Sequence, residues 1–210
     1  MKLSYFEFVF ACSILYTFHS NVLNPMATEI MKLGACPGNI KGYKDFKLEE
    51  LNGVYSVLAM YSKDRLIPRD SCYKIRFKPI NEDGSEVRVV WKSGLLQLPI
   101  KFDFWFEKIS KKNEEQFKIL DSLTGTILLG QAFIFEKIGN DTLLFYSCRP
   151  GFLFHHQEVL VLTKNETISY TAEENKKVGQ ILKEHKLDYG YLKDVDQNRE
   201  SCADLIKSYL

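Results

Sequence analysis

Apolar and polar residues alternate along most of the middle of the chain. The clearest run is residues 72–80, CYKIRFKPI, where Tyr73, Ile75 and Phe77 alternate with lysine or arginine. Successive side chains of a β-strand point to opposite faces, so this alternation indicates strands with one apolar and one polar face. Turn-forming residues, such as the NEDGS run at 81–85, separate the strands. Eight strands are predicted, at residues 53–61, 72–80, 86–92, 99–109, 116–122, 130–138, 142–148 and 157–164.

Short turns join most of these strands, so neighbours in sequence are expected to pair in antiparallel fashion. Eight antiparallel strands that share an apolar face can close into an up-and-down barrel, which removes the exposed edges of the sheet. The predicted fold class is therefore all-β, built on an eight-stranded antiparallel barrel. A barrel of this size either fills with side chains or holds one small ligand.

The period of the pattern changes after the eighth strand. Residues 171–186, TAEENKKVGQILKEHK, begin with Thr171 and Glu174 at the spacing of a capping box. From Val178 onward, mostly apolar positions recur at i, i+3, i+4 and i+7, which is typical of a helix with one narrow apolar stripe. We predict one C-terminal α-helix that packs against the outside of the barrel.

The first 20 residues are typical of a secretory signal, with Lys2 followed by an apolar run at residues 8–18. A membrane anchor is the alternative, but this run is shorter than the ~20 residues that a spanning helix needs. No other segment approaches a transmembrane span. We expect a signal peptide at 1–20, an irregular segment at 21–35, a single domain at 36–210 and a secreted protein.

The cysteines agree with secretion. If the signal is removed, an even number remains, which in an oxidising compartment predicts two disulfides in one of three connectivities. Sequons at Asn140 and Asn165 predict glycosylation. No C-x-x-C pair occurs and no cysteine lies near a histidine in sequence, so a metal site is not predicted. The remaining cysteines are Cys36, Cys72, Cys148 and Cys202.

Charge and motif content narrow the possible functions. The net charge is +1, from 28 basic and 27 acidic residues, and no basic stripe is present, which argues against nucleic-acid binding. Aromatic residues make up 13% of the chain and favour a large apolar interior. His155 and His156, in a loop predicted at 149–156, and His185 have no recognisable nucleophile or carboxylate pair, so no enzyme and no cofactor is predicted. Haem binding through His155 or His156 is the weaker alternative.

The order of these features resembles the lipocalins, especially the secreted group around apolipoprotein D and the insect bilin-binding proteins. The chain has Cys36-Pro37, then a Leu-x-Gly-x-aromatic motif, eight strands, one helix and a terminal cysteine. In the family, a Gly-x-Trp opens the first strand and a late arginine packs on the tryptophan. Here the matches are Gly53-Val54-Tyr55 and Lys164, which keep a cation beside an aromatic ring. The family's middle motif is matched only loosely, near Asn140–Thr142.

The resemblance implies a disulfide pairing, Cys36 with Cys148 and Cys72 with Cys202. Alternation agrees, because Cys72 shares the parity of Lys74 and Arg76 and so points outward, within reach of a tail that wraps the barrel. The residues of opposite parity then point inward, with Tyr55 and Val57 at the closed end. The predicted ligand-binding interior consists of Tyr55, Val57, Tyr73, Ile75, Phe77, Val87, Val89, Trp91, Phe102, Phe104, Phe106, Phe117 and Ile119.

An apolar barrel interior is the usual kind of site for a small hydrophobic ligand, because burial of apolar surface drives such binding. The sequence therefore predicts a secreted carrier of a lipid, pigment or related molecule. The alternative is a secreted lipocalin with a filled barrel that acts on another protein through surface loops, around Ile67-Pro68 and residues 151–156. A cell-surface receptor or a lipid particle is a further possible partner.

Overall fold

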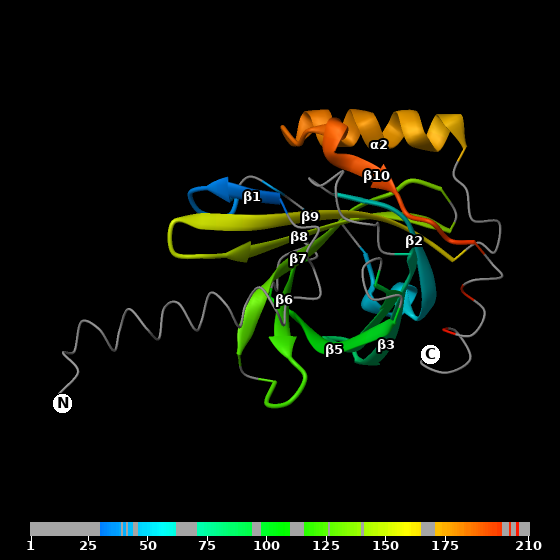
Figure 1. Ribbon diagram of the computed structural model, residues 1–210. Helices are drawn as coiled ribbons and strands as arrows, with labels where there is room; N and C mark the ends of the chain where they lie inside the picture. The colour runs from blue at the N-terminus through cyan, green and yellow to red at the C-terminus, as the bar shows by residue number, and fades with distance from the viewer. Residues whose placement is uncertain are drawn as a thin grey trace, which may run out of the picture.

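The computed structural model in Figure 1 describes residues 30–38, 40, 42–43, 46–61, 71–93, 98–109, 116–125, 127–139, 141–164, 171–198, 202 and 205. The predicted signal segment, the predicted glycosylation sites Asn140 and Asn165, and the Ile67-Pro68 loop lie outside these residues. Within the described ranges, no helix is long and apolar enough to cross a membrane.

The eight predicted strands are confirmed, with boundaries that differ by up to three residues. Each strand pairs in antiparallel fashion with its neighbour in sequence, and β9 pairs with β2 from Ser56↔Thr163 to Met60↔Leu160, which closes the barrel. The closed antiparallel barrel with one packed helix confirms the predicted fold class. The strands are β2 (Gly53–Tyr61), β3 (Ser71–Asn81), β4 (Gly84–Lys92), β5 (Pro99–Lys108), β6 (Gln116–Asp121), β7 (Leu128–Lys137), β8 (Thr142–Pro150) and β9 (Phe154–Thr163).

Two short strands extend this sheet and were missed from the sequence. Strand β1 (Ile30–Leu33) pairs with the start of β9, so the prediction of an irregular segment at 21–35 is wrong over these residues. Strand β2 pairs only with the later part of β9, and β1 pairs with the rest of that edge. Strand β10 (Leu192–Asp194) pairs in the same way with the end of β2. Both strands are too short to show a period of their own, and the unpaired sheet edges explain them.

The apolar residues form an inner and an outer layer. The inner cluster lies inside the barrel, and the 3-10 helix η1 (Leu48–Leu51) contributes Leu48 and Leu51 to it. The outer cluster lies between the barrel and helix α2 (Ala172–Glu184), which runs across the barrel wall in Figure 1. Helix α2 buries Val178, Ile181 and Leu182 there, as the apolar stripe predicts.

The local features of the helix and the cysteines also agree with the predictions. The Thr171 hydroxyl accepts a hydrogen bond from the Glu174 amide at 3.1 Å, and the Thr171 amide donates to the Glu174 carboxylate at 2.7 Å, which completes the capping box. Disulfides join Cys36 to Cys148 and Cys72 to Cys202, as the resemblance implied. The second disulfide lies on the outer side of the barrel, in a small buried cluster with Val90 and Leu205.

Candidate ligand-binding site

The predicted interior residues come together inside the barrel. Twelve of them belong to one buried cluster, and Phe102 is partly buried against it. Alternation was sufficient to place those on β3, β4, β5 and β6, because these strands carry polar residues on their outer faces, whereas Tyr55 and Val57 of β2 were placed by the resemblance.

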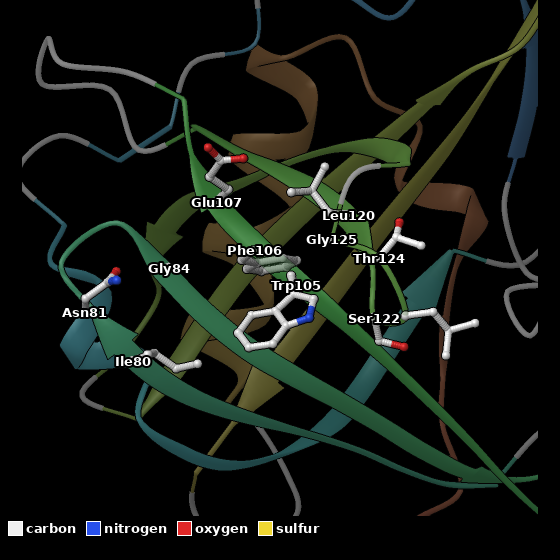
Figure 2. Close-up of a pocket in the computed structure, with 11 residues that line it drawn as sticks. Ile80, Asn81, Gly84, Trp105, Phe106, Glu107, Leu120, Ser122, Thr124 and Gly125 are labelled. Carbon is white, nitrogen blue, oxygen red and sulfur yellow. The ribbon is translucent and has the colours of Figure 1, made fainter.

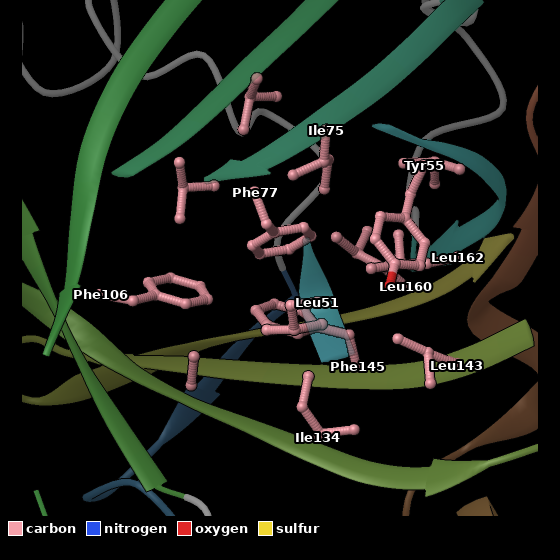
Figure 3. Packing of buried hydrophobic residues seen from close by; sticks show 14 of the residues in the cluster. Leu51, Tyr55, Ile75, Phe77, Phe106, Ile134, Leu143, Phe145, Leu160 and Leu162 are labelled. Carbon is pink, nitrogen blue, oxygen red and sulfur yellow. The ribbon is translucent and has the colours of Figure 1, made fainter. Parts of the chain in front are cut away.

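The ring of Phe106 lies at the centre of this cluster. It contacts four other aromatic rings, with centroid distances of 5.5–5.9 Å to Phe77, Phe104, Phe117 and Phe145. It stacks nearly parallel on Phe117 and Phe145, at interplanar angles of 14° and 4°. Figure 3 shows Phe77, Phe106 and Phe145 pointing toward one another from separate strands. The interior therefore presents aromatic faces and edges, a surface that suits apolar or aromatic groups.

Several interior residues of β7, β8 and β9 were missed from the sequence. These strands are apolar on both faces, because residues of their outer faces belong to the outer cluster with α2, so no alternation marks the inward side. The available signal was the continuous apolar run itself, which is typical of a strand buried on both faces. The missed interior residues include Ile134, Leu143, Phe145, Leu160 and Leu162.

One end of the barrel is closed by η1 and by a cation above an aromatic ring. Lys164 Nζ lies 5.0 Å from the centre of the Tyr55 ring and donates a hydrogen bond to the carbonyl of Glu50 at 3.1 Å. The Tyr55 hydroxyl donates to the same carbonyl at 3.2 Å, and burial raises the pKa of Tyr55. Gly53 has φ +125°, a conformation that favours glycine. The predicted pairing of Lys164 with Tyr55 is confirmed.

The opposite end shows a gradient of exposure. Along β5, Phe106 and Phe104 are buried, whereas Phe102 and Ile100 are only partly buried. Trp91, on the neighbouring strand, stacks on Tyr73 with centroids 5.5 Å apart. The inner surface at this end is therefore largely aromatic; Trp91 and Tyr73 are buried, and Phe102 and Ile100 are partly exposed. We call it the open end of the barrel.

The interior wall also carries polar groups near the open end. Glu158 lies on the same face of β9 as Leu160 and is buried, and the Ser147 hydroxyl donates to its carboxylate at 3.3 Å. His156 follows on the same face, and burial, together with Arg149 and His155, lowers its pKa. These groups can hydrogen-bond a polar substituent on an otherwise apolar ligand. Glu158 and Ser147 were not predicted, because isolated polar residues in apolar strands show no period.

The histidines differ from the predicted loop positions. His155 and His156 lie in β9, because β8 extends to Pro150 and β9 begins at Phe154. His155 is buried, and its Nδ1 lies 2.9 Å from the carbonyl oxygen of Gly34. Among the described residues, no group of three or more histidine, cysteine, aspartate or glutamate side chains is arranged to hold a metal ion.

A hollow lies on the outer face of the barrel and was not predicted. It has a volume of about 510 Å³. Figure 2 shows Trp105 on its floor, with Ile80 and Asn81 on one side and Ser122 and Thr124 on the other. Trp105 is adjacent to Phe104 and Phe106 in sequence, so it points away from the interior.

Among known proteins, solved structures match the architecture of the chain. No protein-family model and no curated protein sequence matches the chain. Insecticyanin from the tobacco hornworm Manduca sexta is 16% identical, over 83% of this chain and 92% of that one, with a TM-score of 0.64. H1 crustacyanin from the lobster Homarus americanus is 14% identical, over 85% and 96%, with a TM-score of 0.60.

The chain has the lipocalin fold. The siderocalin Ex-FABP gives a further match, with 11% identity over 71% of this chain and 95% of that one and a TM-score of 0.55. Identities this low establish the lipocalin architecture and no more. The narrower resemblance to apolipoprotein D and the insect bilin-binding proteins stays a prediction.

Proposed function

We propose that this lipocalin-fold chain is a secreted carrier that holds one small hydrophobic molecule inside its barrel. The observation that supports the proposal is the apolar, largely aromatic inner surface, which continues from the buried Phe106 to the partly exposed Phe102 and Ile100 at the open end. A ligand that enters there exchanges water for apolar side chains, which is worth roughly 25 cal/mol per Å² of apolar surface removed from water. The barrel acts by binding rather than by catalysis.

Two further findings support parts of this proposal. The disulfides Cys36–Cys148 and Cys72–Cys202 are typical of a protein that folds in an oxidising compartment, which agrees with a signal segment at 1–20 and with glycosylation at Asn140 and Asn165. Ex-FABP, which shares the architecture, is described as functioning through dual ligand specificities. A lipid or pigment is the ligand class that the aromatic interior favours, as in the apolipoprotein D and bilin-binding group.

The first test is to identify what the protein carries. The glycosylated protein is purified from culture medium without organic solvent and measured by native mass spectrometry, and the molecules released on denaturation are identified. We expect a stoichiometric hydrophobic compound. A protein that is empty and that also fails to take up fatty acids, retinoids and tetrapyrroles would contradict the carrier function.

The second test compares the two faces of one strand. Phe102→Asp puts a charge on the inner face near the open end, and Trp105→Asp makes the same kind of change on the outer face of β5. We expect Phe102→Asp to weaken the binding of a fluorescent fatty acid by about tenfold or more, because a carboxylate replaces apolar contact. Trp105→Asp is expected to bind like the wild type. If both variants bind the fluorescent fatty acid with equal affinity, the ligand does not bind at the inner face near Phe102.

A second candidate function is recognition through the outer surface. The close packing around Phe106 favours a filled barrel, and the outer hollow around Trp105 offers an alternative contact site. In that case the probe panel would not bind inside, and Trp105→Asp rather than Phe102→Asp would abolish binding to the partner. The pair of variants therefore distinguishes the two functions.

A further inference from the structure

An exposed apolar group lies at the tip of the β8–β9 hairpin. Figure 1 shows this hairpin extending past the other strands, with β1 beside it. Phe152 is 99% exposed and Leu153 60% exposed in the turn, and Leu33 of β1 pairs with Phe154 at the start of β9. We call these exposed side chains the apolar tip; it consists of Met31, Leu33, Phe152, Leu153 and Phe154.

The backbone beneath the apolar tip is held in place by hydrogen bonds. The Gly34 amide donates to the Leu153 carbonyl at 3.0 Å, and the Gly151 amide donates to the Phe154 carbonyl at 2.7 Å. The contact of His155 Nδ1 with the Gly34 carbonyl and the Cys36–Cys148 disulfide tie the same two segments together. The backbone of the apolar tip is therefore held by hydrogen bonds and a disulfide, whereas its apolar side chains are exposed to solvent.

The charged residues in the two segments that carry the apolar tip have one sign. Residues 30–38 and 149–157 contain no aspartate or glutamate, and their charged residues, Lys32 and Arg149, are both basic. This contrasts with the almost balanced charge of the whole chain. A convex apolar projection with a basic flank cannot enclose a small molecule, but it matches a lipid surface, where apolar side chains enter the headgroup boundary and cations attract anionic lipids.

We propose that the apolar tip docks the protein on lipid surfaces that contain anionic headgroups. The inference rests on the carrier function. Strand β8 ends and β9 begins at the open end, where Ile100 and Phe102 are partly exposed. Docking through the apolar tip therefore brings the opening of the barrel close to the lipid from which a hydrophobic ligand is taken or to which it is delivered.

The test uses vesicles as the probe. The full-length secreted protein is sedimented with vesicles of phosphatidylcholine, with or without phosphatidylserine. The test variant carries Phe152→Asp and Leu153→Asp. The matched control is Ile80→Asp, which replaces another exposed apolar residue at the β3–β4 hairpin, at the opposite end of the barrel. We expect the test variant to lose about tenfold or more of the vesicle affinity, because two apolar side chains no longer leave water, and the control to keep it.

The outcomes separate this inference from the carrier function. Binding of the fluorescent fatty acid from solution is measured on the same samples and is expected to be unchanged in the tip variant. If vesicle binding depends on the tip but the barrel takes up no probe, docking stands and the carrier function fails. Docking is overturned if the wild type does not bind vesicles, if the tip variant binds as well as the wild type, or if the tip only mediates a dimer seen by gel filtration.

Discussion

The contact between Lys164 and Tyr55 joins three parts of the chain that are distant in sequence. The lysine follows β9, the tyrosine lies in β2, and both hydrogen-bond the carbonyl of Glu50 in η1. The side chain of Glu50 makes a further contact. The ammonium of Lys137 pairs with the Glu50 carboxylate and keeps the pKa of that carboxyl below its usual value. Two cations therefore fix the helical turn that closes the barrel.

We expect Lys164→Met to lower the free energy of unfolding by about 0.5–1 kcal/mol, the usual value of an exposed cation–π contact. Lys164→Arg is expected to keep or slightly raise the stability, because a guanidinium also stacks on an aromatic ring and donates hydrogen bonds. Urea denaturation of the three proteins measures the difference. Equal midpoints for Met and Arg would show that the cation contributes nothing at this site.

A second residue-level prediction concerns His156. Burial, Arg149 and His155 lower the folded-state pKa of His156 below its ordinary value of 6.5. The unfolded chain therefore binds a proton at higher pH than the folded chain, and stability falls as the pH drops below about 6.5 toward the folded pKa. His156→Gln is expected to flatten this part of the stability profile, measured by urea denaturation between pH 7.5 and 5.5. An unchanged profile would contradict a role for His156.

At the scale of elements, helix α2 determines whether the neighbouring strands carry apolar residues on one face or on both. Its buried face covers β2, β8 and β9, so these strands need apolar residues on both sides. Strands β3, β4, β5 and β6 carry polar residues on the outside and alternate clearly. A single covering element therefore explains two kinds of strand in one barrel.

The covering role of α2 makes a testable prediction. Leu182 is fully buried in the outer cluster, so Leu182→Ala is expected to cost about 2–5 kcal/mol of unfolding free energy. The exposed neighbour Lys183 provides the control, and Lys183→Ala is expected to stay within about 0.5 kcal/mol of the wild type. Affinity for the fluorescent fatty acid should not change in either variant, because both positions lie outside the barrel. A large loss of affinity in Leu182→Ala would show that the two layers are coupled.

This division also explains how far the sequence could predict the site. Where alternation was present, as in the runs that contain Tyr73 and Phe104, the inward residues were assigned correctly. Where α2 removes the alternation, Phe145 and Leu160 were missed. Strand β1 was missed for another reason, because its existence depends on an open edge of β9 that only the closed barrel reveals.

At the scale of the whole molecule, the two disulfides connect the barrel to the segments outside it. Cys148 of β8 holds the segment that follows β1, and Cys72 of β3 holds the C-terminal segment. They belong to different clusters, the outer layer under α2 and the group around Val90 and Leu205. The barrel itself closes through strand pairing. Each disulfide therefore mainly attaches a segment outside the barrel, the one after β1 or the C-terminal one, to a barrel strand.

Removing the disulfides one at a time and together tests this arrangement. Each pair of serine substitutions, at Cys36 and Cys148 or at Cys72 and Cys202, is expected to cost about 2–5 kcal/mol, because each bridge spans more than a hundred residues. The sites share no contacts, so the native-state effects should add.

The two spans overlap, however, so once one bridge is present the other closes a shorter loop in the unfolded chain. The quadruple variant should therefore differ from simple additivity by only a few tenths of a kcal/mol, since loop entropy depends weakly on length. Urea denaturation of the four proteins measures this, and a deviation of several kcal/mol would mean that the two covering segments stabilise each other through the barrel.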